Sequence, residues 1–232
     1  MKTMELSIRL KAIASMIEEC NSIIDVGTDH GYVPIYLVKN GVIKNAIASD
    51  INRGPVEKAK HNITLNNVAS QITCRLGSGL STVKKEEVQV AIIAGMGGNL
   101  IRDILEADLD VVKHFKYMVL QPVQNAEVLR EYLYSSGYDI IDEEICSDDG
   151  KFYEIIKVKY NTKLVEVDSI YYEISKILLD KKSLIMQRFI EYKLQKYSKV
   201  YDTLNDDTIL SKNRKEQLYH IIIRIKEFLK WF

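Results

Sequence analysis

The stretch Ile23–Gly31, Ile-Ile-Asp-Val-Gly-Thr-Asp-His-Gly, most constrains what this chain can fold into. Its first residues are mainly apolar and predict a buried strand. Gly27 and Gly31 then allow a tight turn and a close approach of the backbone to a ligand, because neither has a Cβ atom. A helix expected over residues 31–40 would direct its unpaired N–H groups at the same place. The pattern predicts a strand, a glycine turn and a helix that together bind a nucleotide-like cofactor.

Further apolar segments alternate with helical ones along the chain. The expected strands cover residues 22–26, 42–49, 71–76, 88–94 and 117–120, with helices between them and an amphipathic helix over residues 4–20 before the first. Asp149-Gly150 lies between two more extended segments, residues 138–146 and 152–160, and is typical of a β-hairpin turn. The order predicts an α/β fold with a mostly parallel, seven-stranded, Rossmann-like sheet, helices on both faces and an antiparallel edge hairpin.

The segment 161–232 has a different pattern, with apolar residues at helical spacing in two stretches and a non-periodic segment at 201–207 between them. We therefore divide the chain into a cofactor-binding domain, residues 1–160, and a C-terminal two-helix hairpin, residues 161–232, packed like an antiparallel coiled coil. The hairpin carries 14 Lys and Arg residues against 10 Asp and Glu, whereas the rest carries 18 against 22. Its lysines are expected either to follow a phosphate backbone or to form an ordinary solvated helix surface.

The composition argues against several kinds of site. The three cysteines, Cys20, Cys74 and Cys146, are far apart and form no Cys-x-x-Cys pair, which argues against a zinc site and a disulfide framework. The sequence shows no signal peptide and no run of 18 apolar residues. We therefore expect a cytoplasmic protein that binds neither a metal nor a membrane. We also expect a monomer, although the sequence alone does not determine whether the chain dimerises.

The cofactor is constrained by carboxylates that follow the strands. Asp50 ends the second strand, where a carboxylate can accept hydrogen bonds from both hydroxyls of a ribose, in NAD and in S-adenosyl-L-methionine (SAM) alike. A dinucleotide fingerprint would need glycines at positions 27, 29 and 32, but Asp29 and Tyr32 occupy two of these positions. Asp29 would repel a pyrophosphate, whereas SAM carries a cationic sulfonium and no phosphate. The residues therefore favour SAM.

Asp29 is also the residue that we expect to take part in the chemistry, although its position suits a helix cap equally well. The segment after the fourth strand, residues 94–98, offers no side chain that accepts a hydrogen bond from an exocyclic amine. A ring nitrogen such as adenine N1 already has a lone pair and needs positioning rather than deprotonation. A nearby carboxylate would accept a hydrogen bond from the adenine amine and stabilise the positive charge that methylation creates. Tyr32 lies where an extracted base would stack.

Taken together, the motifs resemble those of one family. They are Leu6-Ser7-Ile8-Arg9-Leu10, Asp25-Val26-Gly27-Thr28-Asp29-His30-Gly31-Tyr32, Ser49-Asp50-Ile51-Asn52, Ala94-Gly95-Met96-Gly97-Gly98, Leu120-Gln121-Pro122 and Asp149-Gly150-Lys151-Phe152-Tyr153-Glu154. Over nearly its whole length, the chain resembles the bacterial tRNA (adenine(22)-N1)-methyltransferases. The resemblance implies a class I SAM-dependent methyltransferase fold with a C-terminal coiled coil. It also implies methyl transfer to N1 of adenine 22 in tRNA, with the C-terminal extension helping to hold the tRNA.

The resemblance also assigns residues to the site. It places SAM on Asp25, Gly27, Thr28, Asp29, His30 and Gly31, on Asp50, Ile51 and Asn52, on Gly77, Ser78 and Gly79, and on Ala94, Gly95, Met96 and Gly97. Substrate contacts are expected at Tyr32, Lys181, Lys182, Lys193 and Lys196. The family usually has an aspartate where this chain has Ser78, so we expect weaker SAM binding. Two alternatives stay open: a methyltransferase acting on another RNA or a small molecule, and a protein that binds SAM or RNA without turnover.

Overall fold

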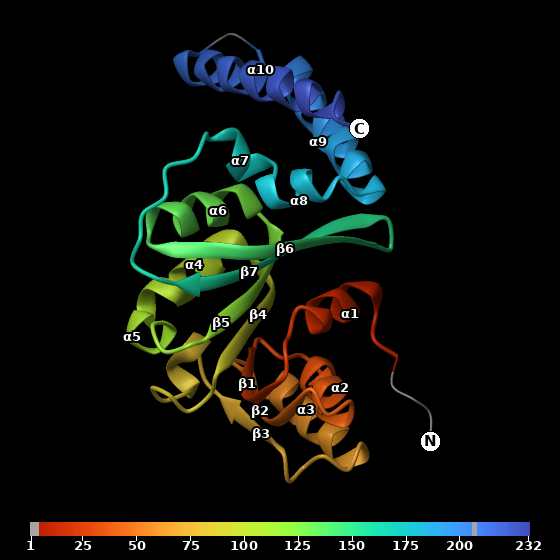
Figure 1. The fold of residues 1–232 in the computed structure, drawn as a ribbon, viewed down its shortest axis with the longest axis vertical. Coiled ribbons are helices and arrows are strands. Elements are labelled where there is room, and N and C mark those ends of the chain that lie inside the picture. Colours follow the sequence, from red (N-terminus) through yellow and green to blue (C-terminus); the bar gives the residue numbers. More distant parts are fainter. Residues whose placement is uncertain (1–4, 206–207) are drawn as a thin grey trace. The chain divides into compact units, whose positions relative to one another are not determined.

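The computed structural model describes residues 5–205 and 208–232, and its main element is one seven-stranded sheet (Figure 1). The strand order is β3-β2-β1-β4-β5-β7-β6. The strands are β1 (Cys20–Val26), β2 (Ile43–Asp50), β3 (Ile72–Leu76), β4 (Val90–Gly97), β5 (Tyr117–Gln124), β6 (Tyr138–Asp148) and β7 (Lys151–Tyr160). The pairs among β1 to β5 are parallel, and β7 runs antiparallel to both β5 and β6. The predicted sheet with its edge hairpin is confirmed.

Helices cover both faces of the sheet (Figure 1). On one face lie α1 (Ile8–Ser15), α2 (Tyr32–Lys39) and α3 (Arg53–Leu65), and on the other α4 (Gly98–Ala107), α5 (Leu109–Val112) and α6 (Ala126–Ser135). Successive strand residues point to opposite faces, so that Ile23 belongs to the first core and Ile24 to the second. The central strands are buried on both faces, and a ligand therefore meets them at their ends.

Two central strands extend further than the sequence predicts. Breaks are expected at Gly95 and at Gln121-Pro122, but β4 continues to Gly97 and β5 to Gln124. The register shifts around Met96, and Gly95 has φ +77°, so the glycines form a β-bulge rather than ending the strand. Pro122 is opposite Met96 in this irregular part of the pair, where a residue without an N–H group is tolerated.

The first helix is shorter than the predicted helix over residues 4–20, of which residue 4 lies outside the described residues. α1 begins after Ser7, whose Oγ accepts a hydrogen bond from the Leu10 N–H at 3.3 Å. Cys20 belongs to β1 instead, where its N–H donates to Val42 O at 3.1 Å. The Arg9 N–H donates to Asp148 Oδ2 at 3.1 Å, which attaches the start of α1 to the β6–β7 hairpin.

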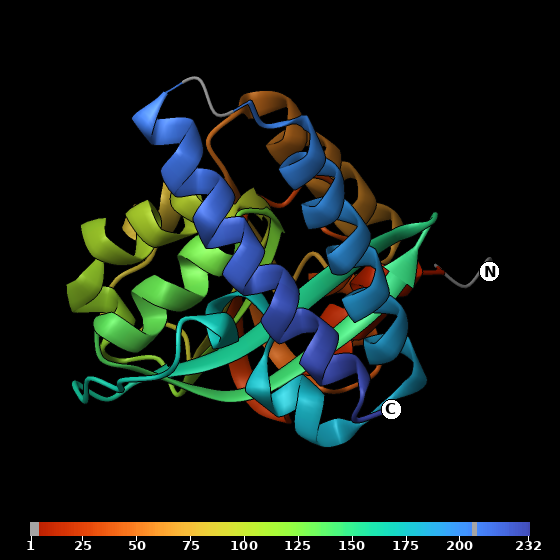
Figure 2. The ribbon, with the colours of Figure 1, turned by 90° about the horizontal axis from the view of Figure 1, so that it is seen from above.

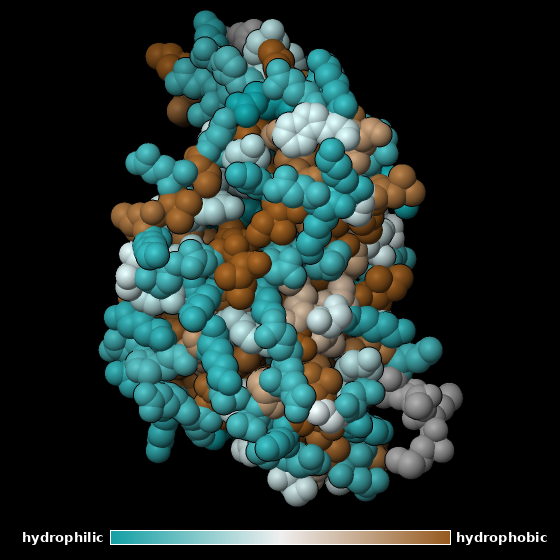
Figure 3. Space-filling view, in the orientation of Figure 1, coloured by the Kyte–Doolittle hydropathy of each residue, from teal (hydrophilic) through white to brown (hydrophobic). Residues whose placement is uncertain are grey.

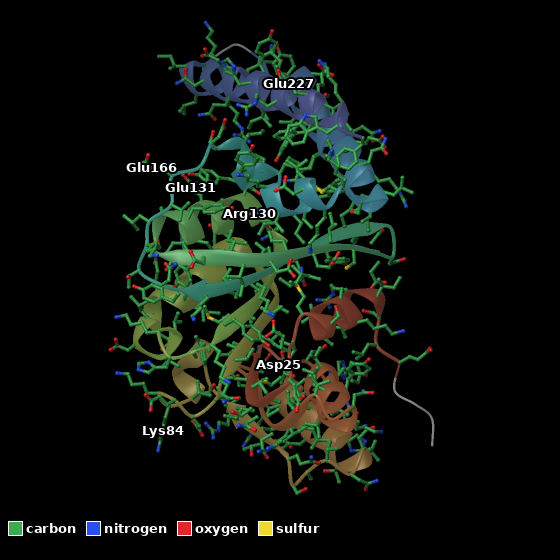
Figure 4. The ribbon with its side chains drawn as sticks, in the orientation of Figure 1. Asp25, Lys84, Arg130, Glu131, Glu166 and Glu227 are labelled. Carbon is green, nitrogen blue, oxygen red and sulfur yellow. The ribbon has the colours of Figure 1, made fainter. Side chains whose placement is uncertain are left out.

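A buried ion-pair cluster joins α6 to the hairpin. Arg130 on α6, labelled in Figure 4, is fully buried. Its Nε donates to Glu143 Oε1 at 2.9 Å, and its Nη2 donates to Glu154 Oε2 at 2.5 Å. Burial opposes the charge of the guanidinium, but the two carboxylates outweigh this effect and raise the pKa of Arg130 above its ordinary value. Because Glu143 lies on β6 and Glu154 on β7, one guanidinium holds the helix and both strands together.

The chain divides into two compact units between Val167 and Asp168. The second unit contains α7 (Ile170–Glu173), α8 (Lys176–Lys181), α9 (Leu184–Thr203) and α10 (Ile209–Leu229). The long helices α9 and α10 contact each other and converge toward the end that carries the C-terminus (Figure 2). Each of the two helices buries one set of mainly apolar side chains. They are Met186, Phe189, Ile190, Lys193 and Tyr197 on α9 and Leu218, Ile222, Ile225 and Phe228 on α10.

The second unit has more helices than the predicted pair. The side chains of Ser175 and Ser183 each accept a hydrogen bond from a backbone N–H group and so begin a new helix, α8 and α9 respectively. Tyr171 on α7 stacks on Phe228 of α10, with ring centroids 6.2 Å apart, which fixes the short helix against the long one. The non-periodic segment predicted at 201–207 begins later than expected, because α9 continues to Thr203, and residues 206–207 lie outside the described residues.

Hydrophilic side chains cover much of the face shown in Figure 3, with apolar side chains in separate groups between them. In the long helices α9 and α10, many charged residues stand between the apolar ones. Within residues 5–205 and 208–232, no helix is both long and apolar enough to span a bilayer.

Candidate functional site

A cavity of about 330 Å³ lies at the carboxyl ends of β1 and β4. In open α/β sheets, ligands bind at this edge, where the strand order reverses. The cavity is lined by Arg9, Leu10, Asp25, Gly27, Thr28, Asp29, His30, Gly31, Tyr32, Val33, Ile92, Ala94 and Gly95. The glycine turn after β1 and the start of the β4 bulge therefore meet in one place, as the sequence predicts.

The turn after β1 has the left-handed backbone that its glycines allow. Gly27 has φ +76° and Gly31 has φ +70°, and α2 begins at Tyr32 directly afterwards. The N–H groups of Gly27 and Thr28 both donate to Ser49 O, at 2.8 and 2.9 Å, which fixes the turn against the end of β2. A Cβ atom on Gly27 would lie 2.3 Å from Met96 Cε, so the turn and the bulge pack closely together.

We expect Gly27→Ala to weaken cofactor binding in addition to destabilising the fold. An alanine in the left-handed region costs about 1–2 kcal/mol of stability, and at position 27 it would also displace Met96. Gly41→Ala is the matched control, because Gly41 has φ +70° and no atom within 4 Å of its Cβ position. Thermal unfolding should show a loss of stability for both variants, larger for Gly27→Ala because Met96 must move, whereas calorimetry with S-adenosyl-L-homocysteine should show weaker binding for Gly27→Ala alone. Equal binding by the two variants would contradict this prediction.

The cavity carries negative charge. Asp25, labelled in Figure 4, is the last residue but one of β1. Its side chain is 8% exposed. Burial raises the pKa of its carboxyl to about 6, and the nearby negative charge of Asp50 acts in the same direction. A cation beside Asp25 would relieve this cost, because it stabilises the ionised carboxylate. The electrostatics at this end of the cavity therefore favour a ligand with a cationic group.

Asp29 lies at the rim of the cavity with its side chain 65% exposed. Its Oδ2 lies 3.1 Å from His30 Nε2, and its Oδ1 lies 3.7 Å from Lys58 Nζ. The cap residue of α2 is Gly31, so Asp29 is not the helix cap that its position in the sequence also allowed. Beside this carboxylate, the rings of His30 and Tyr32 stack on each other with centroids 4.9 Å apart and an angle of 9° between their planes.

The other residues predicted to bind SAM lie outside the lining of this cavity, at the neighbouring strand ends. Asp50 ends β2, and its Oδ1 accepts a hydrogen bond from the Asn52 N–H at 2.7 Å; Ile51 between them is 65% exposed. The Gly77 N–H donates to Asp50 O at 3.0 Å, so the turn after β3 lies beside Asp50. Ser78 is exposed and precedes a short 3₁₀ helix that begins at Gly79, while Met96 and Gly97 complete the β4 bulge.

Of the four lysines predicted to contact phosphate, three are exposed and one is buried. Lys181, Lys182 and Lys196 are exposed in the second unit. Lys193 is 5% exposed, and its Nζ lies 3.3 Å from Glu173 Oε2 and 3.4 Å from the Tyr197 hydroxyl. This buried ion pair holds α9 to α7, so we remove Lys193 from the predicted phosphate contacts.

Several cavity residues were not assigned to the site from the sequence: Arg9, Leu10, Val33 and Ile92. Val33 and Ile92 have the sequence pattern of ordinary core residues of a helix and a strand, and nothing in that pattern indicates that they line a cavity. Arg9 lies in the motif Leu6–Leu10, which is a local signal, but its route into the cavity depends on α1 packing against a hairpin more than 100 residues away. Among the described residues, no group of three or more His, Cys, Asp or Glu side chains is arranged to hold a metal.

The sheet order, the glycine turn after β1 and the carboxylate at the end of β2 define a class I methyltransferase. The family model for tRNA (adenine(22)-N(1))-methyltransferase, TrmK, matches residues 23–227. The chain belongs to this family, whose reaction is the SAM-dependent methylation of N1 of adenine 22 in tRNA. The tRNA (adenine(22)-N(1))-methyltransferase of Bacillus subtilis is 33% identical to it over 235 residues, covering 99% of both chains.

Solved structures agree with this assignment over nearly the whole chain. The crystal structure of the B. subtilis enzyme superposes with a TM-score of 0.87 at 32% identity and covers 98% of this chain and 100% of that one. The M. capricolum TrmK, solved with S-adenosyl-homocysteine, gives a TM-score of 0.83 at 27% identity over 95% and 98% of the two chains. The structure of a putative tRNA (m1A22) methyltransferase from Streptococcus pneumoniae in complex with SAM gives a TM-score of 0.86 at 31% identity. The match covers 97% of this chain and 100% of that one.

The residues of this chain fit SAM, the cofactor of the family. Gly27 and Gly95 both have positive φ, a backbone conformation that glycine adopts readily, and both line the cavity. The buried Asp25 and the rim residue Asp29 suit the cationic amine and sulfonium, and Asp50 suits the ribose hydroxyls. When bound, SAM supplies the methyl group of the reaction; the side chains around it bind and orient both reactants.

Proposed function

We propose that Asp29 holds the target adenine and stabilises the positive charge that forms on its ring. The observation that supports this role is the position of the carboxylate, at the cavity rim beside the stacked pair His30 and Tyr32. Adenine stacked on the outer face of this pair would bring its exocyclic amine to Asp29, which would accept a hydrogen bond from it. Adenine N1 attacks with its own lone pair, so Asp29 contributes position and charge rather than proton abstraction. Asp25, Gly27–Gly31, Asp50–Asn52, Gly77–Gly79 and Ala94–Gly97 would hold SAM.

The reaction itself is tested by incubating the purified protein with SAM and unmodified tRNA and mapping the methylated nucleoside. We expect 1-methyladenosine at position 22 and no methylation of a tRNA in which adenine 22 is replaced by guanine. Because N1 is inaccessible in a stacked and paired adenine, the base must leave its stack to react. Methylation of other RNAs or of small-molecule acceptors at a similar rate would favour the alternative substrates, and tRNA binding without transfer would favour a binding protein.

We further propose that the second unit, Asp168–Phe232, binds tRNA through phosphate contacts of Lys181, Lys182 and Lys196. Replacing all three with glutamine should weaken tRNA binding and make it less dependent on salt. The slope of log Kd against log salt should fall by roughly 2–3, since each lost contact removes about 0.7–0.9. Filter binding over a range of salt concentrations measures this slope.

The matched control for these lysines removes the same charge from the first unit. Lys84→Gln, Lys85→Gln and Lys113→Gln change exposed residues outside the proposed tRNA surface. We expect the control to keep both the affinity and the salt slope. If the slope of log Kd against log salt falls equally in the two triple variants, the effect comes from net charge and not from contacts of the second unit.

Three further assignments concern the oligomeric state, the location in the cell and the need for a metal ion. We propose that the protein acts as a monomer in the cytoplasm, where unmodified tRNA is available, and that transfer needs no metal ion. Added chelator should therefore leave the rate of methylation unchanged. Sedimentation of the purified protein at the concentration of the assay tests the monomer.

A further inference from the structure

We propose that the second unit binds one unpaired base of the tRNA in a cavity between α9 and α10, an inference that rests on the proposed tRNA binding by this unit. The cavity has a volume of about 300 Å³ and is lined by Tyr201, Lys212, Lys215, Glu216 and Tyr219. Tyr201 belongs to α9 and the other four residues to α10. This tyrosine cavity combines aromatic rings, on which a base can stack, with positive charge for the phosphate next to that base.

The tyrosine cavity exists because the two long helices separate toward one end. They converge toward the end that carries the C-terminus (Figure 2), and Tyr201 lies near the other end, two residues before α9 ends. Tyr197 is the last buried residue of α9, and Leu218 is the first of α10. Beyond these two residues the side chains between the helices are only partly covered, which leaves space for a ligand.

The two tyrosine rings of the cavity are held by each other and by a lysine. The ring centroids of Tyr201 and Tyr219 lie 6.4 Å apart with 35° between the planes, and Lys215 Nζ lies 5.4 Å from the centroid of Tyr201. The rings are too close and too tilted for a base to enter between them. Tyr219 is 50% exposed, so a base can stack on its outer face.

The charges of the cavity distinguish a nucleotide from other ligands. Lys212 and Lys215 attract a phosphate and repel a cationic side chain of a partner protein. Glu216 repels a free phosphate, but its carboxylate can accept hydrogen bonds from the amine or ring N–H groups of a base. An RNA nucleotide suits all three charges and the rings. The base must be unpaired and unstacked, because neighbouring bases cover its faces within a helix.

The test separates stacking from charge at this cavity. Filter binding should show that Tyr219→Leu weakens tRNA binding by about 5- to 150-fold, the usual effect of losing one stacked base. The slope of log Kd against log salt should stay the same, because no charge is removed. The matched control, Tyr219→Phe, keeps the ring and should keep the wild-type Kd. Lys212→Gln should instead lower the slope by about 0.7, the contribution of one phosphate contact on a single strand.

Tyr219→Leu should keep the wild-type melting temperature and the wild-type Kd for S-adenosyl-L-homocysteine, because the side chain is half exposed. An unchanged Kd for tRNA in this variant, or an equal loss in Tyr219→Phe, would overturn the stacking site. Self-association of the wild type that Tyr219→Leu abolishes, with tRNA binding unchanged, would show that the cavity is a contact with a second copy of the chain.

The triple lysine variant of the proposed function distinguishes two kinds of failure. If that variant loses affinity for tRNA and Tyr219→Leu does not, the second unit binds tRNA and only the stacking site is wrong. If both variants bind tRNA as the wild type does, the proposed tRNA binding by the second unit is wrong as well.

Discussion

Asp29→Asn should lower kcat for tRNA methylation by about 100- to 1000-fold, the usual effect of removing one group that stabilises charge in a transition state. The asparagine has nearly the same shape but no negative charge to offset the cation that forms on adenine. Asp29 is 65% exposed and contacts His30 and Lys58, so its replacement should leave the fold intact. Single-turnover rates with saturating SAM and tRNA measure the effect on the chemical step.

The binding of S-adenosyl-L-homocysteine decides whether Asp29 acts on the substrate or on the cofactor. We expect Asp29→Asn to weaken binding of this product far less than it lowers kcat, because the product lacks the sulfonium charge and Asp25 still lines the cavity as a partner for its amine. The matched control is Asp103→Asn, which removes another exposed carboxylate in an ion pair, with Arg102 at 2.7 Å, away from the cavity. Full activity of Asp29→Asn with unchanged cofactor binding would exclude Asp29 from the chemistry.

The parts of the site that follow from local sequence could be predicted. A glycine turn after an apolar strand, and a carboxylate at the end of the next strand, depend on a few neighbouring residues and on the parallel order of the sheet. The β4 bulge could not be predicted in this way. Gly95 looks like the end of a strand, and only its pairing with the extended β5 makes the backbone continue to Gly97.

Long-range contacts account for the remaining differences. Arg9 enters the cavity because Gln121 and Asp148, which lie 112 and 139 residues away in sequence, bind its side chain and backbone. Lys193 shares a helical Lys-rich stretch with Lys196, but Glu173 on another helix draws it into the interior. The spacing of apolar residues shows which face of a helix is buried. It does not show which lysine on that helix pairs with a buried carboxylate on another element.

Arg130→Met should destabilise the first unit by about 3–5 kcal/mol, since it removes the guanidinium that neutralises the buried carboxylates of Glu143 and Glu154. For a chain of this length, the loss corresponds to a fall in melting temperature of roughly 6–20 °C. Arg102→Met is the matched control, because Arg102 lies on the surface of α4 in an exposed ion pair and its loss should cost less than about 0.5 kcal/mol. Urea denaturation of the two variants measures the difference.

A triple variant separates the charge from the packing of this cluster. Arg130→Met combined with Glu143→Gln and Glu154→Gln removes the two carboxylates together with their partner. We expect this variant to be more stable than Arg130→Met alone, because an uncompensated buried charge costs more than a neutral amide. If the triple variant is as unstable as the single one, the guanidinium stabilises α6 and the β6–β7 hairpin by filling space rather than by neutralising charge. The hairpin also carries Asp148, which binds the Arg9 N–H, so loss of this cluster should weaken the cofactor site at the same time.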